Sequence, residues 1–433
     1  MTGVAVVGAA EAQMGEALPG MSAADVMAEA ALAALADAGL AVEEVDGVFA
    51  ASTQLPWASV TLSENLRIRP RHQDSTMLGG ASPMAHVNHA RAAIAAGLCE
   101  VALIAYGSTQ RSVGRAQASV QEVDPWEAPY APPLPVAAYA LAASRHMHEY
   151  GTTAEQLAWV AVSARRWAQR REGAWSRDDL SLEDVAASRR VCDPFGVRDC
   201  CLVTDGGAAI VVTSVARARA LKRPPVFVLG AAEAQTHRFV SSMPDLTTTA
   251  AYASGARAFA EAGLRPADVQ SAQLYDAFTI TPILFLEDLG FCEKGEGGAF
   301  VADGRIAPGG VLRVNTSGGG LSYGHPGMNG LPLLVEAVRE VRDEGKDVVL
   351  AHGNGGVLST QATVLLGSED AASQRPRSKV ARLREPAGAT MGRRRRANPQ
   401  RSTTRAEGDR PLESPRLKGS VPLSASGSRG LTP

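Results

Sequence analysis

The chain has 433 residues, of which 45% are hydrophobic and 20% charged, and its formal net charge is −2. This length allows two or three domains around a large buried core. The composition is that of a globular protein, and no apolar run approaches the roughly 18 residues that suggest a membrane-spanning helix. The sequence therefore predicts a protein without a membrane segment.

The first part of the chain predicts alternating strands and helices. VAVVGAAEAQ at 4–13 predicts a strand and loop, and it is not preceded by the basic stretch and apolar block of a signal peptide, so we expect a cytoplasmic protein. SAADVMAEAALAALADAG at 22–39 predicts a helix, since Ser stands at the N-cap and Gly follows the end. GLCEVALIAYG at 97–107 predicts a buried strand, in which Cys99 is a small apolar residue.

Residues 108–200 break this alternation with Pro- and Arg-rich helical pieces, which indicate a long insertion or cap. Two histidines in this segment, His146 and His148, are two positions apart on a predicted helix and therefore point to different faces. The five cysteines have no metal-finger spacing. We expect structural or surface histidines here and no metal site.

The second part of the chain repeats the first. VFVLGAAEAQ at 226–235 repeats 4–13, and AEAGL at 260–264 corresponds to ADAGL at 36–40. GKDVVLAHG at 345–353 then resembles the earlier GLCEVALIAYG. Three matches in the same order indicate two copies of one unit.

These patterns divide the chain into three parts. The first unit comprises 1–222, with the insertion at about 108–200, and the second comprises 223–369. Within each unit the alternation of strands and helices predicts mainly parallel sheets covered by helices. Residues 370–433 carry 15 Lys+Arg against 5 Asp+Glu and no Phe, Trp or Tyr, so this basic tail is expected to be disordered. An inert appendage is favoured over an arm that binds anionic surfaces, and no nucleic acid is expected.

Several motifs carry a family resemblance. TDGGAAIVV at 204–212, LYDAFTITPILFLEDLG at 274–290 and a Gly-His-Pro motif at 324–326 follow one another in the order and at the separations of the thiolase superfamily. Over roughly 3–367 the chain resembles its sterol-carrier-thiolase and lipid-transfer-protein branch in particular. The resemblance implies an α/β thiolase fold, with two duplicated βαβαβαββ halves in a five-layer αβαβα sandwich and one active site between the halves.

The residue that thiolases use as nucleophile is missing. Thiolases place a reactive cysteine at the N-terminus of a central helix, where the helix dipole favours a thiolate. The family spacing puts this position at Gly80. The only nearby hydroxyl, Ser82, is better explained as a helix cap. We therefore expect no covalent acyl transfer at this position.

The other family positions are kept but altered. Tyr275 and Asp276 stand in the YDAF segment, where thiolases have Asn or His before the acidic residue. Tyr323 directly precedes the motif that contains His325, and the second thiolase cysteine falls at His352. This combination resembles the thiolase-like retro-aldolases of steroid side-chain degradation. It implies cleavage of a β-hydroxyacyl-CoA, such as a sterol side-chain CoA thioester, to a ketone and a shortened acyl-CoA.

Two phenols in one pocket could divide the proton transfers of such a cleavage. We expect Tyr323 to take the β-hydroxyl proton with help from His325 and Tyr275 to reprotonate the enolate, although the reverse order is nearly as well supported. His325 and the N–H groups of the glycine loop, including Gly320 and Gly324, could stabilise the enolate oxygen.

Three further residues have two readings each. His352 would orient the substrate or form a structural hydrogen bond at a strand end. Asp276 would orient the catalytic groups or cap the following helix. Lys294, which lies between acidic residues, is the lysine to consider for a Schiff-base aldolase, a mechanism that we disfavour.

The resemblance also implies a homodimer and a partner of the OB-fold, zinc-ribbon kind, so that a heterotetramer is possible. No cofactor is expected beyond the CoA thioester that serves as substrate. Two alternatives remain open: a thiolase-type acyltransferase or condensing enzyme, and a catalytically inactive lipid-transfer or scaffold homologue.

Overall fold

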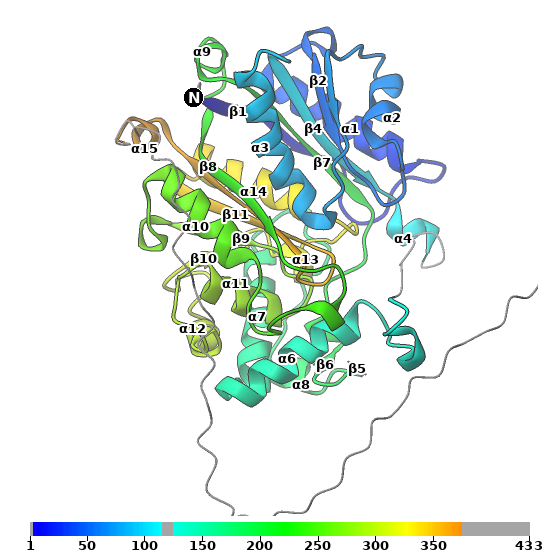
Figure 1. The fold of residues 1–433 in the computed structure, drawn as a ribbon, viewed down its shortest axis with the longest axis vertical. Coiled ribbons are helices and arrows are strands. Elements are labelled where there is room, and N and C mark those ends of the chain that lie inside the picture. The colour runs from blue at the N-terminus through cyan, green and yellow to red at the C-terminus, as the bar shows by residue number, and fades with distance from the viewer. Residues whose placement is uncertain (1–2, 115–123, 375–433) are drawn as a thin grey trace, which may run out of the picture. The chain divides into compact units, whose positions relative to one another are not determined.

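The computed structural model describes residues 3–114 and 124–374. Within them, ten strands form one sheet in the order β10-β9-β11-β12-β8-β1-β7-β4-β2-β3, and a separate hairpin joins β5 to β6 (Figure 1). The strands are β1 (Val4–Glu11), β2 (Gly47–Ala50), β3 (His72–Asp74), β4 (Val101–Ser108), β5 (Arg190–Cys192), β6 (Phe195–Gly196), β7 (Gly206–Ser214), β8 (Val226–Gln235), β9 (Ser271–Leu274), β10 (Arg313–Val314), β11 (Val348–Gly355) and β12 (Thr360–Gly367).

The strand order is symmetric about the centre of the sheet. Read outward from the centre, one half contains β1, β7, β4, β2 and β3, and the other contains β8, β12, β11, β9 and β10. Each strand thus has a counterpart in the other half, and the repeated segments found in the sequence form the corresponding strands β1 and β8. Within the described sheet, strands β1 and β8 join the halves through two residue pairs, Ala5 with Phe227 and Val6 with Val226.

The expectation of mainly parallel sheets is wrong. β7 pairs antiparallel with both β1 and β4, and β12 pairs antiparallel with both β8 and β11, whereas the outer strands of each half are parallel. The reason is visible in the second half, where β12 follows β11 after a short turn. A short turn can join only antiparallel neighbours, because a parallel pair needs a long crossover connection.

Helices cover and separate the halves. Those of the two repeats are α1 (Ala23–Ala38), α2 (Ala58–Asn65), α3 (Ser82–Ala95), α9 (Val215–Ala218), α10 (Ala251–Ala262), α11 (Ile280–Asp288), α12 (Gly297–Val301), α13 (Gly319–Ser322), α14 (Gly330–Arg342) and α15 (Glu369–Ser373). α1 packs on β1, β4 and β7, and α10 packs on β8 and β12. α3 and α14 pack on each other and on strands of both halves, which gives the five layers of the expected thiolase fold.

The predicted helix at 22–39 is confirmed as α1. The Ser22 side chain accepts a hydrogen bond from the Asp25 N–H, and Gly39 ends the helix in the left-handed conformation with φ 69°. Both features match their usual roles at helix ends. Cys99 is buried, as expected.

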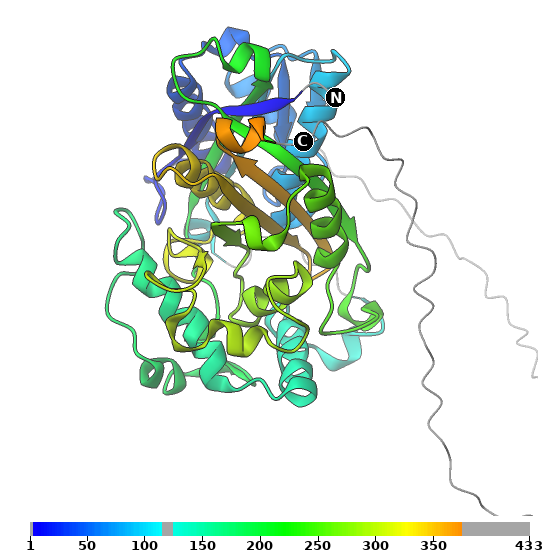
Figure 2. The same ribbon diagram turned by 90° about the vertical axis from the view of Figure 1, so that its left-hand side faces the viewer.

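The inserted segment contains α4 (Gln110–Val113), α6 (Val136–Tyr150), α7 (Ala154–Ala168), α8 (Leu182–Ala186) and the β5–β6 hairpin. It belongs to the first repeat by sequence but packs against the second: α6 contacts α11, and α7 contacts α12 and α13. Figures 1 and 2 show these helices below the second half of the sheet. The insertion is therefore in a position to contact the loops of the second repeat.

The predicted tail at 370–433 lies outside the described residues except at its start, where α15 spans residues 369–373. None of the helices in the described part of the chain is long and apolar enough to cross a membrane.

Candidate active site

The N-terminus of the central helix α3 carries no nucleophile, because another side chain occupies the space. A Cβ on Gly80 would lie 2.2 Å from Tyr275 Cε2 and 2.6 Å from the Asn354 carbonyl oxygen, closer than real Cβ contacts. Ser82 is buried, and its hydroxyl accepts a hydrogen bond from the Leu78 N–H at 2.7 Å instead of capping the helix. The glycine is thus needed for the tyrosine to fit.

Tyr275 and His325 form the polar pair at this position. The Tyr275 hydroxyl lies 3.0 Å from His325 Nε2, and the two rings meet edge-on with centroids 5.5 Å apart. The Asn329 N–H donates to the same hydroxyl oxygen at 3.3 Å. The phenolic hydrogen has two acceptors within reach, His325 Nε2 at 3.0 Å and the Gly327 carbonyl at 3.5 Å, and the shorter contact favours Nε2. Tyr275 directly follows β9 and His325 lies in the Gly-His-Pro loop, so both belong to the second repeat.

Burial keeps both members of this pair neutral. It raises the pKa of Tyr275 well above its usual value, an effect that the Asn329 N–H only partly offsets. It lowers the pKa of His325 to about 4. At neutral pH the pair is therefore a phenol next to an imidazole, which together can pass a proton in either direction.

The first repeat holds the Gly-His-Pro loop in place. The Tyr106 hydroxyl, at the end of β4, donates to the Pro326 carbonyl at 2.5 Å and accepts from the Met328 N–H at 3.2 Å. The Thr204 hydroxyl accepts from the His325 N–H at 3.0 Å, and the Thr204 N–H donates to the His325 carbonyl at 3.2 Å. Neither anchor was predicted from the sequence, although Tyr106 lies near the end of the apolar strand β4 and Thr204 shortly precedes the apolar strand β7.

Tyr323 points elsewhere. Its hydroxyl donates to Glu11 Oε2 at 2.6 Å, and the Arg171 guanidinium lies 6.0 Å from its ring centroid. Burial raises the pKa of Glu11 to about 7, and burial together with the Glu11 carboxylate raises the pKa of Tyr323. The structure does not bring Tyr323 and His325 together as expected: the Tyr323 hydroxyl contacts Glu11, whereas His325 Nε2 contacts Tyr275.

Asp276 holds residues 318–324, the glycine turn that precedes His325. Its carboxylate accepts from the N–H groups of Gly320 at 2.7 Å and Leu321 at 3.2 Å, so it caps α13 and not the helix that follows it in sequence. The Gly324 N–H donates to a carbonyl of the same turn, and the space beside its Cα is filled by Met14. Neither Gly320 nor Gly324 thus has a free N–H for an enolate oxygen, which contradicts that expectation.

His352 is a structural residue in this fold. Its Nδ1 lies 2.9 Å from the Thr363 hydroxyl and its Nε2 lies 2.9 Å from Gln361 Oε1, both on the neighbouring strand β12. Burial lowers its pKa to about 4. Since both ring nitrogens are occupied, the structural reading of His352 is favoured over substrate orientation.

Lys294 and the two histidines of α6 are also accounted for. Lys294 Nζ lies 2.6 Å from Asp288 Oδ1 and 3.2 Å from Glu287 Oε2. Burial lowers its pKa, but these carboxylates outweigh burial and hold the pKa above its usual value, which opposes Schiff-base chemistry. His146 is buried 3.0 Å from Glu287 Oε1, whereas His148 is exposed, so the two face in different directions.

A separate cavity of about 370 Å³ lies in the inserted segment. It is lined by α7, α8 and the β5–β6 hairpin, including Leu157, Val185 and Arg190. None of its lining residues belongs to the Tyr275–His325 pair.

Comparison with known proteins agrees with this architecture. Residues 232–368 match the family model described as thiolase C-terminal domain-like. A steroid side-chain-cleaving aldolase of Thermomonospora curvata is 36% identical over 349 residues, which cover 75% of this chain and 86% of that protein. The chain belongs to the thiolase superfamily.

Two further relatives indicate which branch of the thiolase superfamily the chain is most similar to. The 17-hydroxy-3-oxo-4-pregnene-20-carboxyl-CoA lyase of Mycobacterium tuberculosis is 36% identical over 378 residues, covering 79% of this chain and 92% of that protein. A solved structure named Ltp2-ChsH2(DUF35) aldolase has a TM-score of 0.76 and 32% identity, covering 84% of this chain and 98% of that chain. The protein is accordingly a thiolase-like carbon–carbon lyase.

The buried carboxyl of Asp276 makes the stability of this thiolase-like chain depend on pH. Burial raises its pKa from 3.8 to about 7, against the opposing effect of the Gly320 and Leu321 N–H groups. The folded state then holds the proton more tightly than the unfolded state. This stabilisation is complete below about pH 4 and is lost as the pH rises through about 7, with an upper limit of roughly 4 kcal/mol.

Asp276→Asn, which carries no titrating group, should therefore show a smaller loss of the free energy of unfolding between pH 5 and pH 8 than the wild type. Urea unfolding at several pH values measures this difference, and the comparison removes the contributions of other groups such as Glu11. Equal pH dependence in both proteins would contradict the raised pKa of Asp276.

Proposed function

We propose that this chain cleaves a β-hydroxyacyl-CoA by a retro-aldol reaction, with a sterol side-chain CoA thioester as the substrate class and a ketone and a shortened acyl-CoA as products. One observation carries the proposal: the Tyr275 ring fills the space that a thiolase nucleophile would need at Gly80, and its hydroxyl binds His325. A phenol and an imidazole thus replace thiolate chemistry. The names of the two lyase relatives support the substrate class.

In the proposed mechanism the substrate's β-hydroxyl gives its proton to the Tyr275 oxygen while the Tyr275 proton moves to His325 Nε2. The Cα–Cβ bond then breaks, its electron pair forms the thioester enolate, and the β-carbon becomes the ketone. Return of the proton along the same pair reaches Cα and regenerates both residues. The steps balance without oxidation or reduction, so the proposed reaction needs no cofactor.

The neutral states of the pair fit this sequence of transfers. An imidazole with a pKa of about 4 is unprotonated at neutral pH and can accept a proton. A phenol whose pKa is held high by burial is protonated at the start and can donate to a carbanion-like carbon, which is a far stronger base. The roles assigned to Tyr275 and His325 are part of the proposal.

The experiment is to incubate the purified full chain with a β-hydroxyacyl-CoA, in separate arms with and without free CoA and with and without a co-expressed OB-fold, zinc-ribbon partner. Release of ketone and shortened acyl-CoA is the expected result. Cleavage only in the presence of free CoA would favour the acyltransferase alternative. Binding without turnover in every arm would favour an inactive lipid carrier.

We propose the partner and a homodimer as the assembly, with a heterotetramer as the full complex, and a cytoplasmic location. The similar solved aldolase is named for two components, Ltp2 and ChsH2(DUF35), which supports a partner protein.

The homodimer is supported by an exposed apolar surface at one edge of the sheet. β3 is an edge strand, and Trp57, Val60 and Met77 near it are exposed, Trp57 by 74%. Sedimentation equilibrium should give a dimer mass for the wild type and a lower mass for Trp57→Glu. A monomeric wild type would contradict the dimer.

A further inference from the structure

Arg165 of α7 is a buried cation without an anionic partner. Only 3% of it is exposed. Its Nε donates to the Ser322 hydroxyl at 3.0 Å, and its Nη1 donates to the Asp178 carbonyl at 2.8 Å. Within residues 3–114 and 124–374, no carboxylate lies within ion-pair distance of this guanidinium.

Such an arrangement destabilises the folded state. The groups that it hydrogen-bonds are neutral, so burial removes the hydration of the guanidinium with little compensation. Burial and the nearby Arg198 cation lower the pKa of Arg165, and the Asp178 carboxylate offsets this only in part. A methionine, whose side chain has a similar length, would fill the same space without the free-energy cost of burying a charge. The arginine therefore suggests a task other than stability.

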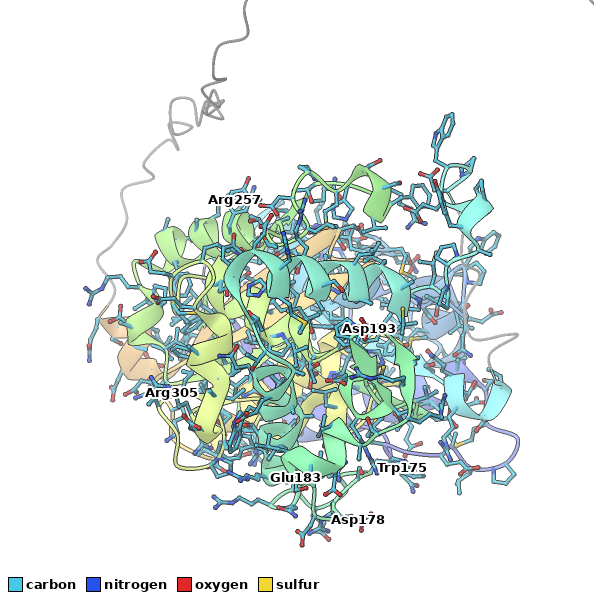
Figure 3. The ribbon with its side chains drawn as sticks, turned by 90° about the horizontal axis from the view of Figure 1, so that it is seen from below. Trp175, Asp178, Glu183, Asp193, Arg257 and Arg305 are labelled. Atoms are coloured by element: carbon cyan, nitrogen blue, oxygen red, sulfur yellow. The ribbon has the colours of Figure 1, made fainter. Side chains whose placement is uncertain are left out.

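Arg165 belongs to a set of contacts between the inserted segment and the glycine turn. The Trp175 N–H donates to the Tyr323 carbonyl at 2.9 Å, and the Ser176 N–H donates to the Ser322 carbonyl at 3.0 Å. In Figure 3 Trp175 and Asp178 lie at the same edge of the view. Behind the turn, a Cβ on Gly318 would lie 2.6 Å from the Ala168 side chain, so α7 packs directly on its backbone.

We propose that Arg165 is a positioning residue for the lyase reaction: it fixes Ser322 and, through it, the loop 318–325 that presents His325 to Tyr275. This inference rests on the proposed function and deepens it. It also gives the insertion a role in the chemistry, since the first repeat by sequence supplies a residue that holds the catalytic loop of the second.

The geometry explains why a single hydrogen bond could matter here. His325 is three residues after Ser322, and its N–H donates to the Thr204 hydroxyl at 3.0 Å. Arg165 and Thr204 thus each hold one residue of the same loop, Ser322 and His325 respectively. If Ser322 were released, the 3.0 Å contact between His325 and Tyr275 could lengthen, and a shift of about 1 Å costs about 100-fold in rate.

Arg165→Met tests the proposal, with Arg166→Met as the matched control. Arg166 is the next residue but is exposed and lies over the Trp159 ring at 5.3 Å. In full-length Arg165→Met, hydrogen–deuterium exchange in the peptide 318–327 should be about 10-fold faster, the size expected for a lost hydrogen bond, while Arg166→Met should exchange like the wild type. Unchanged exchange in Arg165→Met would overturn the proposal.

The kinetic arm separates positioning from simple destabilisation. In Arg165→Met, kcat should fall about 10- to 100-fold while KM changes less than about 3-fold. Guanidinium at low millimolar concentration should restore part of kcat to Arg165→Ala but not change Arg166→Ala. A loss of activity that only follows the unfolded fraction, with no rescue, would show a structural role and overturn the proposal.

The two proposals can fail independently. If the wild type does not cleave any β-hydroxyacyl-CoA but loop exchange still accelerates only in Arg165→Met, the retro-aldol function fails while the hold of Arg165 on the loop stands. If the wild type cleaves and Arg165→Met behaves like Arg166→Met in both measurements, the function stands and the role of Arg165 is refuted.

Discussion

Tyr275→Phe is expected to lower kcat for β-hydroxyacyl-CoA cleavage by about 10²- to 10⁴-fold, the range of general acid–base catalysis. The change leaves the ring beside Gly80 but removes the hydroxyl that contacts His325 Nε2 and the Asn329 N–H. Because packing is kept, KM should change little. Steady-state rates of ketone release measure the effect.

Two other tyrosines serve as comparisons. Tyr130→Phe is the control, since Tyr130 is 83% exposed, and it should leave kcat unchanged. Tyr323→Phe removes a donor to Glu11, not to His325, and should lower kcat by about 10-fold or less, the scale of one lost hydrogen bond. A larger effect at Tyr323 than at Tyr275 would overturn the assignment of the catalytic phenol.

Gly80→Cys should not create a thiolase but should destabilise the protein. The new Cβ would lie 2.2 Å from the Tyr275 ring and 2.6 Å from a backbone carbonyl, and forced overpacking costs about 1–3 kcal/mol or somewhat more. Displacement of Tyr275 should also abolish cleavage. Urea unfolding and the cleavage assay measure the two effects.

A double-mutant cycle with Gly80→Ala and Tyr275→Ala tests whether a clash with the Tyr275 ring causes this destabilisation. Since the clash is between these two side chains, Gly80→Ala should cost clearly less in the Tyr275→Ala background than in the wild type, with a coupling of about 1 kcal/mol or more. The Asn354 carbonyl remains close in both backgrounds, so some cost should persist. Strict additivity would refute a direct contact between the positions.

Much of the fold follows from local sequence signals. The repeated strand VAVVGAAEAQ marks β1 and β8, and the Ser22 and Gly39 caps delimit α1. The directions of the strands could not be predicted in this way. The alternation of strand and helix patterns does not show that β7 and β12 each pair with the first strand of their own repeat. That choice depends on pairing between distant segments.

The sequence indicated which residues form the candidate site, but not which of their side chains contact one another. Motif positions identified Tyr275, His325 and the glycine at 80, but sequence proximity suggested Tyr323 as the partner of His325. Side-chain direction within a tight turn decides that question, and the Glu11 carboxylate that receives the Tyr323 hydroxyl is 312 positions away. Such long-range partners leave no local signal.

The most direct test of the central claim is cleavage of a β-hydroxyacyl-CoA in D₂O without free CoA, followed by mass spectrometry of the products and the intact protein. The account predicts a ketone, a shortened acyl-CoA with one deuterium at Cα, and no mass added to the protein. An acyl adduct on the protein, or product formation only after free CoA is supplied, would contradict cleavage by a phenol–imidazole pair.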